Sequence, residues 1–306
     1  HSKDIANVMS IADASCYSAK DGGRNRVHVA EQDDMQIATR RGEMQWVSKI
    51  TQALNDNSFS LYYQKIEPLG TEAQQATGIE LLLRMQDGDG ELISPGAFIP
   101  AAERYNLMTQ LDRWVVSKAL EWLSANPQLN SKLFKCSINL SGQSFSDERF
   151  LDEVKQDLTT LDIDPSIICF EVTETAAISN LAKATEFIDE LKALGCCFAL
   201  DDFGSGLSSF AYLKNLSVDF IKIDGMFVKD IVHDSIDKEM VRSITSIAKA
   251  MGKETIAEFV ENEEIKQILV EMDVDYIQGY HVEKPRPLED YPLTQEVKQK
   301  LTQQGF

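Results

Sequence analysis

The stretch from Cys197 to Asp224 reads CFALDDFGSGLSSFAYLKNLSVDFIKID, and it joins two apolar runs by a loop rich in glycine and serine. The first run ends in the adjacent aspartates Asp201 and Asp202, and the second carries Lys222 at its centre. Adjacent carboxylates are costly to hold together unless a cation shares them. A lysine inside an apolar run likewise needs a partner or a catalytic task. The stretch therefore predicts one part of a metal-assisted reaction centre.

On either side of this stretch, strand-like and helical patterns alternate about eight times. Strand-like runs are expected at residues 60–66, 78–85, 135–141, 167–174, 197–203, 220–224, 254–260 and 276–280. Helical patterns lie at residues 108–125, 150–161, 180–194, 231–251 and 263–272. This alternation predicts an α/β protein with a TIM-type (β/α)8 barrel. Residues 67–76 join the first two strands without a helix, so we expect a hairpin whose first strand runs antiparallel to the others.

The composition is that of a globular protein, with 43% hydrophobic and 26% charged residues. Its 306 residues suffice for one large barrel or for two ordinary domains. The net charge of -19 argues against binding to a nucleic-acid polymer, which needs a basic face. A small anionic ligand stays possible, because metal ions and a few cations can reverse the field inside a cleft. No apolar run approaches the roughly 20 residues of a membrane span.

Cysteine and histidine usage gives no sign of disulfides or of a zinc site. The five cysteines lack CxxC spacing, and the four histidines are scattered along the chain. We therefore expect reduced cysteines and a cytoplasmic domain. The chain begins at His1 with neither a methionine nor a signal-peptide pattern, which favours an excised fragment. An inner-membrane anchor of the parent protein is left open.

Polar residues lie inside nearly every predicted strand, which is more than a structural core tolerates. Strand alternation places Glu80, Leu82 and Arg84 on the barrel interior and turns Leu81 and Leu83 toward the helices. Further polar residues expected inside the strands or at their ends are Asn139, Glu171, Asp201, Asp202, Lys222, Asp224, Glu258 and Gln278.

The oxygen donors among these residues suit Mg²⁺ or Mn²⁺, because histidine and cysteine are absent from the set. The candidate ligands are Glu80, Asn139, Glu171, Asp201, Asp202 and Glu258, and their five carboxylates exceed what one Mg²⁺ usually takes from a protein. Two ions are therefore the better prediction, and two metals about 4 Å apart suit in-line attack on a phosphodiester.

Several motifs, in the right order, resemble those of the EAL domain, the family of cyclic di-GMP-specific phosphodiesterases. The resemblance covers about residues 46–285 and begins with ELLLR at 80–84, where the family has EALLR. The other matching motifs are NLSGQSF, EVTET, DDFGSGLSS, FIKID, IAEFVEN (family VAEGVET) and DYIQGYHVEKP (family CDYGQGYLFGRP). Departures are leucine for tyrosine in DDFGSGLSS, and Lys65, Leu81 and Phe259 where the family has proline, alanine and glycine. None of them removes a metal ligand.

The resemblance implies roles for individual residues. It implies metal ligation by Glu80, Asn139, Glu171, Asp201, Asp202 and Glu258, with Asp201 shared by both ions. It implies catalysis by Lys222 and Glu258, with Lys222 orienting the attacking water. It implies substrate contacts for Gln64, Leu83, Arg84, Asp224 and Gln278, although Asp224 could equally cap a helix. It implies that Glu174 and Glu261 brace the DDFGSGLSS loop, which links metal binding to dimerisation.

The N-terminal stretch ADASCYSAKDGGRNRVHV resembles the end of a GGDEF domain, the diguanylate cyclase family, which reads ADxALYxAKxxGRNRV. The nucleotide-binding part of that domain is absent, and an ordinary N-terminal helix is the alternative. We therefore predict a GGDEF-like remnant at 1–34, a helical linker or first barrel helix at 35–56, and an EAL barrel at 57–306.

The resemblance implies hydrolysis of cyclic di-GMP to linear pGpG by a two-metal in-line mechanism, in bacterial signalling and biofilm control. One alternative is a catalytically weak or inactive cyclic di-GMP receptor, and another is a barrel that acts on a different phosphodiester. A homodimer, and GGDEF and sensory domains upstream in the parent chain, are the partners that the resemblance implies.

Overall fold

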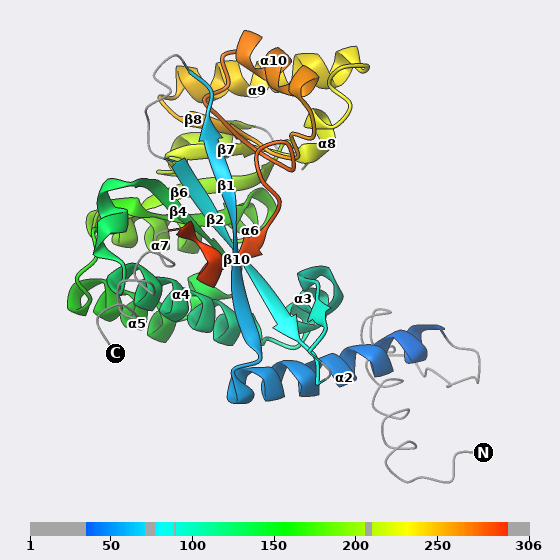
Figure 1. Cartoon of the computed structure of the whole chain (residues 1–306), viewed down its shortest axis with the longest axis vertical. Helices are drawn as coiled ribbons and strands as arrows, with labels where there is room; N and C mark the ends of the chain where they lie inside the picture. The colour runs from blue at the N-terminus through cyan, green and yellow to red at the C-terminus, as the bar shows by residue number, and fades with distance from the viewer. Residues whose placement is uncertain (1–34, 71–76, 89, 206–209, 293–306) are drawn as a thin grey trace. The chain divides into compact units, whose positions relative to one another are not determined.

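The computed structural model describes residues 35–70, 77–88, 90–205 and 210–292 (Figure 1). These residues divide into two compact units: residues 35–59 with Met85–Leu107, and Ser60–Arg84 with everything described from Met108 onward. The predicted GGDEF-like remnant lies outside the described residues. The predicted domain boundaries therefore stay a prediction.

Eight strands of the second unit close into a barrel, in the order β1-β9-β8-β7-β6-β5-β4-β2, with β2 pairing back to β1. They are β1 (Phe59–Pro68), β2 (Thr77–Gln86), β4 (Leu133–Leu140), β5 (Ile168–Thr173), β6 (Cys197–Phe203), β7 (Phe220–Ile223), β8 (Glu254–Ala257) and β9 (Tyr276–Gln278). Neighbours from β2 through β9 are parallel, whereas β1 is antiparallel to β9. The short strand β10 (Arg286–Pro287) adds to β1. The barrel and its antiparallel first strand are both confirmed.

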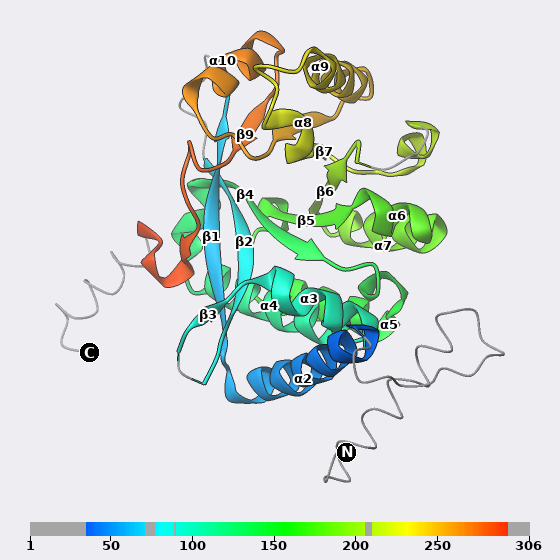
Figure 2. The same cartoon turned by 90° about the vertical axis from the view of Figure 1, so that its right-hand side faces the viewer.

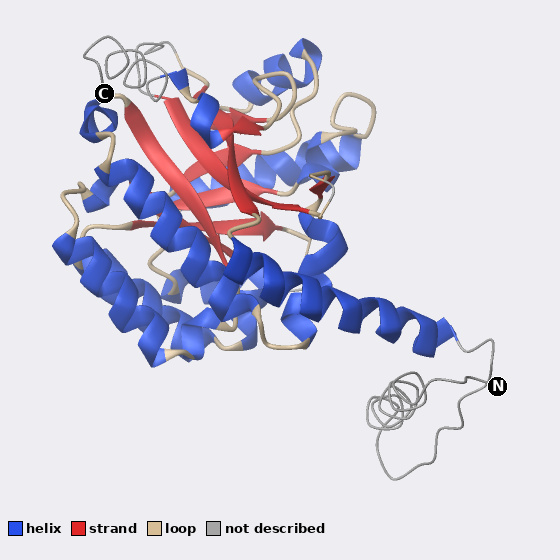
Figure 3. Cartoon of the chain, turned by 60° about the horizontal axis from the view of Figure 1, so that its bottom comes forward, coloured by secondary structure: helices blue, strands red, loops and turns tan. Residues whose placement is uncertain are grey.

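Helices surround this barrel, as the red strands and blue helices of Figure 3 show. Those expected from the sequence are α4 (Met108–Ser124), α5 (Glu148–Thr160), α7 (Leu181–Ala193), α9 (Ser235–Ala250) and α10 (Glu263–Glu271). Side chains of Asp147, Asp234 and Asn262 accept hydrogen bonds from the first free backbone amides of α5, α9 and α10. Shorter pieces are α6 (Glu174–Ser179), α8 (Gly225–Val228) and the 3-10 turns at Pro127–Ser131, Ser144–Ser146, Pro165–Ile167, Phe210–Asn215 and Leu288–Asp290. Figure 2 shows α6 and α7 beside β5 and β6.

The first unit packs α2 (Met35–Asp56) and α3 (Pro95–Arg104) around a small core of its own. Its strand β3 (Leu92–Ile93) pairs antiparallel with the last residues of β2. The rings of Phe59 and Phe98 lie 5.9 Å apart, and Ile50 and Met85 are buried near the same helices. No helix within the described part of the chain is long and apolar enough to cross a membrane.

The barrel interior is built in layers, because alternate residues of each strand point inward. One layer is apolar and consists of Ile66, Cys169, Ala199, Phe220, Ile256 and Tyr276. The ring of Phe134 stacks on Tyr276 at 4.8 Å and meets Phe220 edge-on at 5.7 Å. Two residues further along five of these strands, the inward positions are polar. This second layer faces the C-terminal ends of the strands, where (β/α)8 barrels place their chemistry.

Candidate active site

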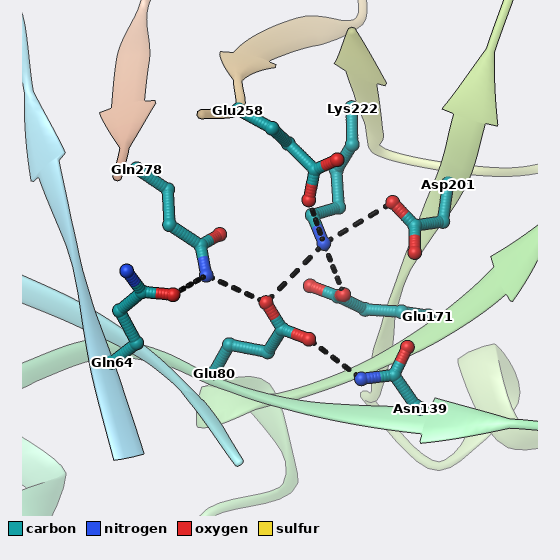
Figure 4. Close-up of polar contacts among 8 residues, drawn as sticks. All are labelled: Gln64, Glu80, Asn139, Glu171, Asp201, Lys222, Glu258 and Gln278. Carbon is teal, nitrogen blue, oxygen red and sulfur yellow. Dashed lines mark hydrogen bonds and ion pairs between the residues drawn. The ribbon is translucent and has the colours of Figure 1, made fainter. Parts of the chain in front are cut away.

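Lys222 is the centre of the polar layer, and its side chain is 1% exposed (Figure 4). Its Nζ lies 2.6 Å from Glu171 Oε2 and 2.8 Å from Glu258 Oε1. Asp201 Oδ1 is 3.2 Å away and Glu80 Oε2 is 3.4 Å away. Four carboxylates from β2, β5, β6 and the end of β8 thus surround one ammonium group. The predicted convergence of these residues is confirmed.

Two amides hold Glu80 from either side (Figure 4). Gln278 Nε2 donates a 2.6 Å hydrogen bond to Glu80 Oε2, and Asn139 Nδ2 donates one of 2.7 Å to Oε1. Gln278 also donates to Gln64 Oε1 at 3.1 Å, and Gln64 in turn donates to the backbone carbonyl of Glu283. Side chains of β9 and β4 therefore position Glu80 directly, and Gln64 of β1 holds Gln278 in turn.

A β-bulge explains how two consecutive aspartates reach one site. The pairing of β6 with β7 shifts register between Leu200 and Phe203, and Asp202 has φ +54°. Bulges re-aim side chains in this way beside active sites, and aspartate tolerates the left-handed conformation. Carboxylate oxygens of Asp201, Asp202 and Glu258 consequently lie within 4.8 Å of one another.

Burial and mutual repulsion raise the pKa of several of these carboxyl groups. The pKa of Asp202 is raised to about 6 and that of Glu258 to about 8, in both cases first by burial and then by repulsion from Asp201. Lys222 partly offsets both shifts. The pKa of Lys222 itself is raised well above its usual range, because the four carboxylates outweigh its burial. Its ammonium group is therefore charged at neutral pH.

Glu80 and Glu171 are both buried, yet their pKa values shift in opposite directions. Burial and repulsion raise the pKa of Glu171 well above the usual range despite Lys222. The pKa of Glu80 is lowered, because attraction to Lys222 and the amide hydrogen bonds outweigh its burial. Hydrogen bonds to an ionised carboxylate favour the charged form, and Glu171 Oε1 is buried without a hydrogen-bond partner. The opposite pKa shifts of Glu80 and Glu171 therefore agree with the amide hydrogen bonds from Gln278 and Asn139, which only Glu80 accepts.

The residues of this site fit a divalent cation. The donors are carboxylate and amide oxygens, and five carboxylates carry more negative charge than the single ammonium group of Lys222 can balance. The buried Glu171 Oε1 still needs a partner. Oxygen-rich sets of this kind suit Mg²⁺ or Mn²⁺ better than zinc. The Asp201, Asp202 and Glu258 cluster can accordingly hold a metal ion.

Glu174 connects both ends of the loop that follows β6. Its Oε2 accepts a 3.0 Å hydrogen bond from the backbone amide of Gly204, and its Oε1 accepts one of 2.7 Å from the Tyr212 hydroxyl. The carboxylate is buried at the start of α6. This geometry agrees with the predicted bracing role. Glu261 is exposed at the edge of a cavity, and its bracing role stays a prediction.

A cavity of about 330 Å³ opens beside the carboxylates, within the range of small-ligand sites. Its floor includes Gln64, Glu80, Glu258 and Gln278, as expected. Six further lining residues, Leu82, Lys229, Phe259, Gly279, Tyr280 and Pro285, had no site role predicted from the sequence. Strand alternation had already turned Leu82 inward. Lys229, Phe259 and Tyr280 lie beyond strand ends, where alternation no longer predicts direction.

Leu83, Arg84 and Asp224 were predicted to contact the substrate, and in the structure each contacts another part of the protein. Leu83 packs against the hydrophobic core, and its neighbour Leu82 lines the cavity instead. Arg84 is half-buried, donates to the Leu83 carbonyl at 2.8 Å and lies 5.4 Å from the Tyr62 ring centroid. Asp224 caps α8 by accepting a 2.8 Å hydrogen bond from the Met226 amide, as the helix-cap alternative predicted. Substrate roles for these three residues stay predictions.

The chain matches one sequence family and is similar to curated proteins that share the name cyclic di-GMP phosphodiesterase. The family model for the EAL domain matches residues 47–285. The chain is 41% identical over 285 residues to the cyclic di-GMP phosphodiesterase PdeB of Shewanella oneidensis, which covers 93% of this chain. It is 38% identical over 244 residues, or 80% of its length, to the cyclic di-GMP phosphodiesterase PdeF of Escherichia coli. The chain spans about a third of each relative, 33% of PdeB and 32% of PdeF.

Solved structures give the same family. The FimX EAL domain from Pseudomonas aeruginosa, solved with bound c-di-GMP, is 30% identical with a TM-score of 0.74. That match covers 81% of this chain and 99% of the FimX chain. The PaMucR phosphodiesterase, solved as a c-di-GMP complex, is 30% identical with a TM-score of 0.73, over 80% of this chain and 99% of its own. This chain therefore belongs to the EAL domain family.

Proposed function

We propose that this chain is a metal-dependent phosphodiesterase that hydrolyses cyclic di-GMP to linear pGpG and so lowers this second messenger in bacterial cells. The observation that carries the proposal is the convergence of Glu80, Glu171, Asp201 and Glu258 on Lys222. Two of these carboxylates, Glu80 and Glu258, also line the cavity. The names of the relatives and the c-di-GMP bound to the similar structures support this substrate.

Two Mg²⁺ or Mn²⁺ ions are the proposed cofactors. Glu80, Asn139, Glu171 and Asp201 would hold the first ion, and Asp201, Asp202 and Glu258 would hold the second. When bound, such ions neutralise negative charge on the phosphate oxygens and on the leaving oxygen of a phosphodiester.

The chain's own side chains then position a water and handle its proton. Lys222, held between Glu171 and Glu258, donates a hydrogen bond to the water oxygen and orients it toward phosphorus. The new P–O bond forms as the bond to the 3′ oxygen breaks, and the electron pair of that bond leaves with the 3′ oxygen. Glu258, whose Oε1 lies 2.8 Å from the Lys222 Nζ, accepts the water proton. The proton then neutralises the 3′ oxygen.

The amide groups of Gln278 and Gln64 are proposed to contact the substrate near Glu80. Both side chains are buried and line the cavity. Arg84 is proposed as a phosphate contact, since a guanidinium group matches phosphate oxygens in geometry. One Nη1 donor is occupied by the Leu83 carbonyl, and the other guanidinium N–H groups would make the phosphate contact.

A product assay tests the proposal directly. The purified chain is incubated with cyclic di-GMP and excess Mg²⁺ or Mn²⁺, and the nucleotides are separated by ion-exchange chromatography. We expect pGpG as the product, and we expect chelation of the metal to stop its formation. No pGpG with either metal overturns the proposal. Metal-independent binding without product would instead identify a receptor, and preferential cleavage of linear dinucleotides would identify a different phosphodiesterase.

We also infer from the family that the chain acts in the cytoplasm as a homodimer, with GGDEF and sensory domains upstream in its parent. Sedimentation analysis with and without Mg²⁺ tests the dimer. A monomer at micromolar concentration under both conditions would contradict it.

A further inference from the structure

Phe259 combines three features that a lone exposed phenylalanine does not have. It directly follows Glu258 and lines the cavity, and its side chain is 50% exposed. Its φ is +53°, a left-handed conformation that is unfavourable for a bulky residue. Such strain persists only where the surrounding structure enforces it, and it gathers at functional sites.

The neighbouring backbone shows how this conformation is enforced. Gly279 follows the site residue Gln278, and a Cβ at Gly279 would come 2.2 Å from the Val260 carbonyl oxygen. The amide of Val260 donates to the Gln278 carbonyl, and that of His281 donates to the Val260 carbonyl. The chain on both sides of Val260 is therefore clamped to the segment after β9, which sets the direction of the Phe259 side chain.

One face of the Phe259 ring lies on α8 and the residue after it. A Cβ at Gly225 would come 2.1 Å from the ring atom Cδ2, so only glycine leaves room for the ring there. The Nζ of Lys229 lies 4.1 Å from the ring centroid. Gly225 and Lys229 are four residues apart, so they lie on one side of the helical turn, next to the ring. The side chain is nevertheless 50% exposed and lines the cavity, so part of the ring is open to a ligand there.

We propose that Phe259, seated on Gly225 and Lys229, stacks against one guanine base of the substrate and so raises the affinity for cyclic di-GMP. The inference rests on the proposed function and adds a base-recognition residue to it. An aromatic face beside a phosphate-hydrolysing centre suits a purine, whose π face stacks on phenylalanine. Lys229 contributes a positive charge to a cavity whose other charged lining residues are Glu80, Glu258 and Glu261, which favours an anionic dinucleotide.

Three substitutions test the stacking role, with affinity measured calorimetrically in EDTA so that no hydrolysis occurs. Phe259→Leu keeps an apolar side chain without a π face, and Phe259→Gly removes the side chain and the backbone strain together. Gly225→Ala displaces the ring without changing it. We expect each variant to raise the Kd for cyclic di-GMP by about 5- to 100-fold, the range seen when a base loses an aromatic stacking partner. In the presence of metal we expect KM to rise with kcat nearly unchanged.

A merely structural role would give a different pattern. Glycine accepts φ +53° without strain, so Phe259→Gly should keep or raise the free energy of unfolding while it weakens ligand binding. If Phe259 served only packing, Phe259→Gly would lower stability and leave Kd and KM unchanged.

Fluorescence gives a second readout. A tryptophan introduced by Phe259→Trp should lose emission when cyclic di-GMP stacks on it, again in EDTA. The matched control is Val270→Trp, at an exposed position of α10 that does not line the cavity, and its emission should not change.

The outcomes separate this inference from the proposed function. A wild-type chain that neither binds nor cleaves cyclic di-GMP would contradict the proposed function. A wild-type chain that cleaves it, together with wild-type Kd and KM in Phe259→Leu, Phe259→Gly and Gly225→Ala, would overturn the stacking role alone. Unchanged emission of Phe259→Trp on binding would also overturn it.

Discussion

Lys222 is a buried cation among more negative charge than it can neutralise. Its four carboxylate neighbours lie between 2.6 and 3.4 Å from Nζ. Transfer of such groups out of water is costly, and attraction repays that cost only when each charge keeps a partner. The lysine therefore stabilises the metal-free site as well as serving the proposed reaction.

Replacing Lys222 by methionine should lower the free energy of unfolding of the metal-free protein at pH 8 by about 3–5 kcal/mol. The physical reason is that Glu171 and Glu258 lose their closest cation while they stay buried. Urea denaturation monitored by circular dichroism measures the change. The same variant should lose hydrolysis by roughly 100-fold or more.

The control for this substitution is Lys183→Met. Lys183 pairs with Glu186 at 3.2 Å on the exposed surface of α7, and exposed pairs contribute less than about 1 kcal/mol. Equal stability losses in the two variants would mean that the carboxylate cluster does not depend on Lys222.

At the scale of elements, short segments at strand ends position the chemistry. The bulge in β6 aims two carboxylates into one site, α6 begins at Glu174, and α8 presents Gly225 to the Phe259 ring. None of these segments is long enough to show a hydrophobic period. The expected strand at 167–174 ends at Thr173 because the Thr173 side chain caps α6 instead. α3 was missed as well, since Pro95 and Pro100 obscure its helical pattern.

Glu174→Ala should loosen the loop after β6 and weaken metal binding at the neighbouring Asp202. The substitution leaves the Gly204 amide and the Tyr212 hydroxyl without their acceptor, which costs about 1–3 kcal/mol for groups of this kind. Hydrogen exchange of the Gly204 amide should become faster, and a higher Mg²⁺ concentration should be needed for half-maximal activity. Tyr212→Phe removes only one of the two hydrogen bonds and serves as the graded comparison. Exchange at Gly204 that stays unchanged in Glu174→Ala would contradict the bracing role.

At the scale of the whole molecule, the barrel stacks a polar layer directly on an apolar one. Five strands contribute to both layers with residues two positions apart, as Phe220 and Lys222 of β7 do. The apolar layer fills the interior and keeps the strands in register, while the polar layer gathers charge at one end. Stability and function therefore share the same strands but occupy different layers.

This layering links global stability to pH through the carboxyl groups. The pKa values of Asp202 and Glu258 are raised in the folded protein, to about 6 and about 8, above the values of the unfolded chain. Between the unfolded and the folded pKa of each group, the folded state binds more protons than the unfolded state. The free energy of unfolding therefore falls as pH rises through that range. We expect the Tm of the metal-free protein to fall between pH 5.5 and 8.5.

Metal should reverse this trend. A bound cation needs deprotonated carboxylates, so its affinity rises over the same pH range and its stabilisation grows with it. Differential scanning calorimetry at pH 5.5, 7 and 8.5, with and without Mg²⁺, measures both effects. A Tm difference between metal-bound and metal-free protein that does not grow with pH would argue against metal binding at these carboxylates.

The sequence by itself determined the barrel, its antiparallel first strand and the residues that converge on Lys222. Period-two alternation within strands is a local property, and the closed barrel brings equivalent positions of different strands together. Tertiary structure alone decided the partners of Arg84 and the position of the Phe259 ring at the cavity. Those features depend on side-chain packing between segments distant in the chain, such as Gly225 beneath a ring at position 259. Contacts of that kind produce no periodic pattern in the sequence, because each depends on how side chains from two distant segments pack together.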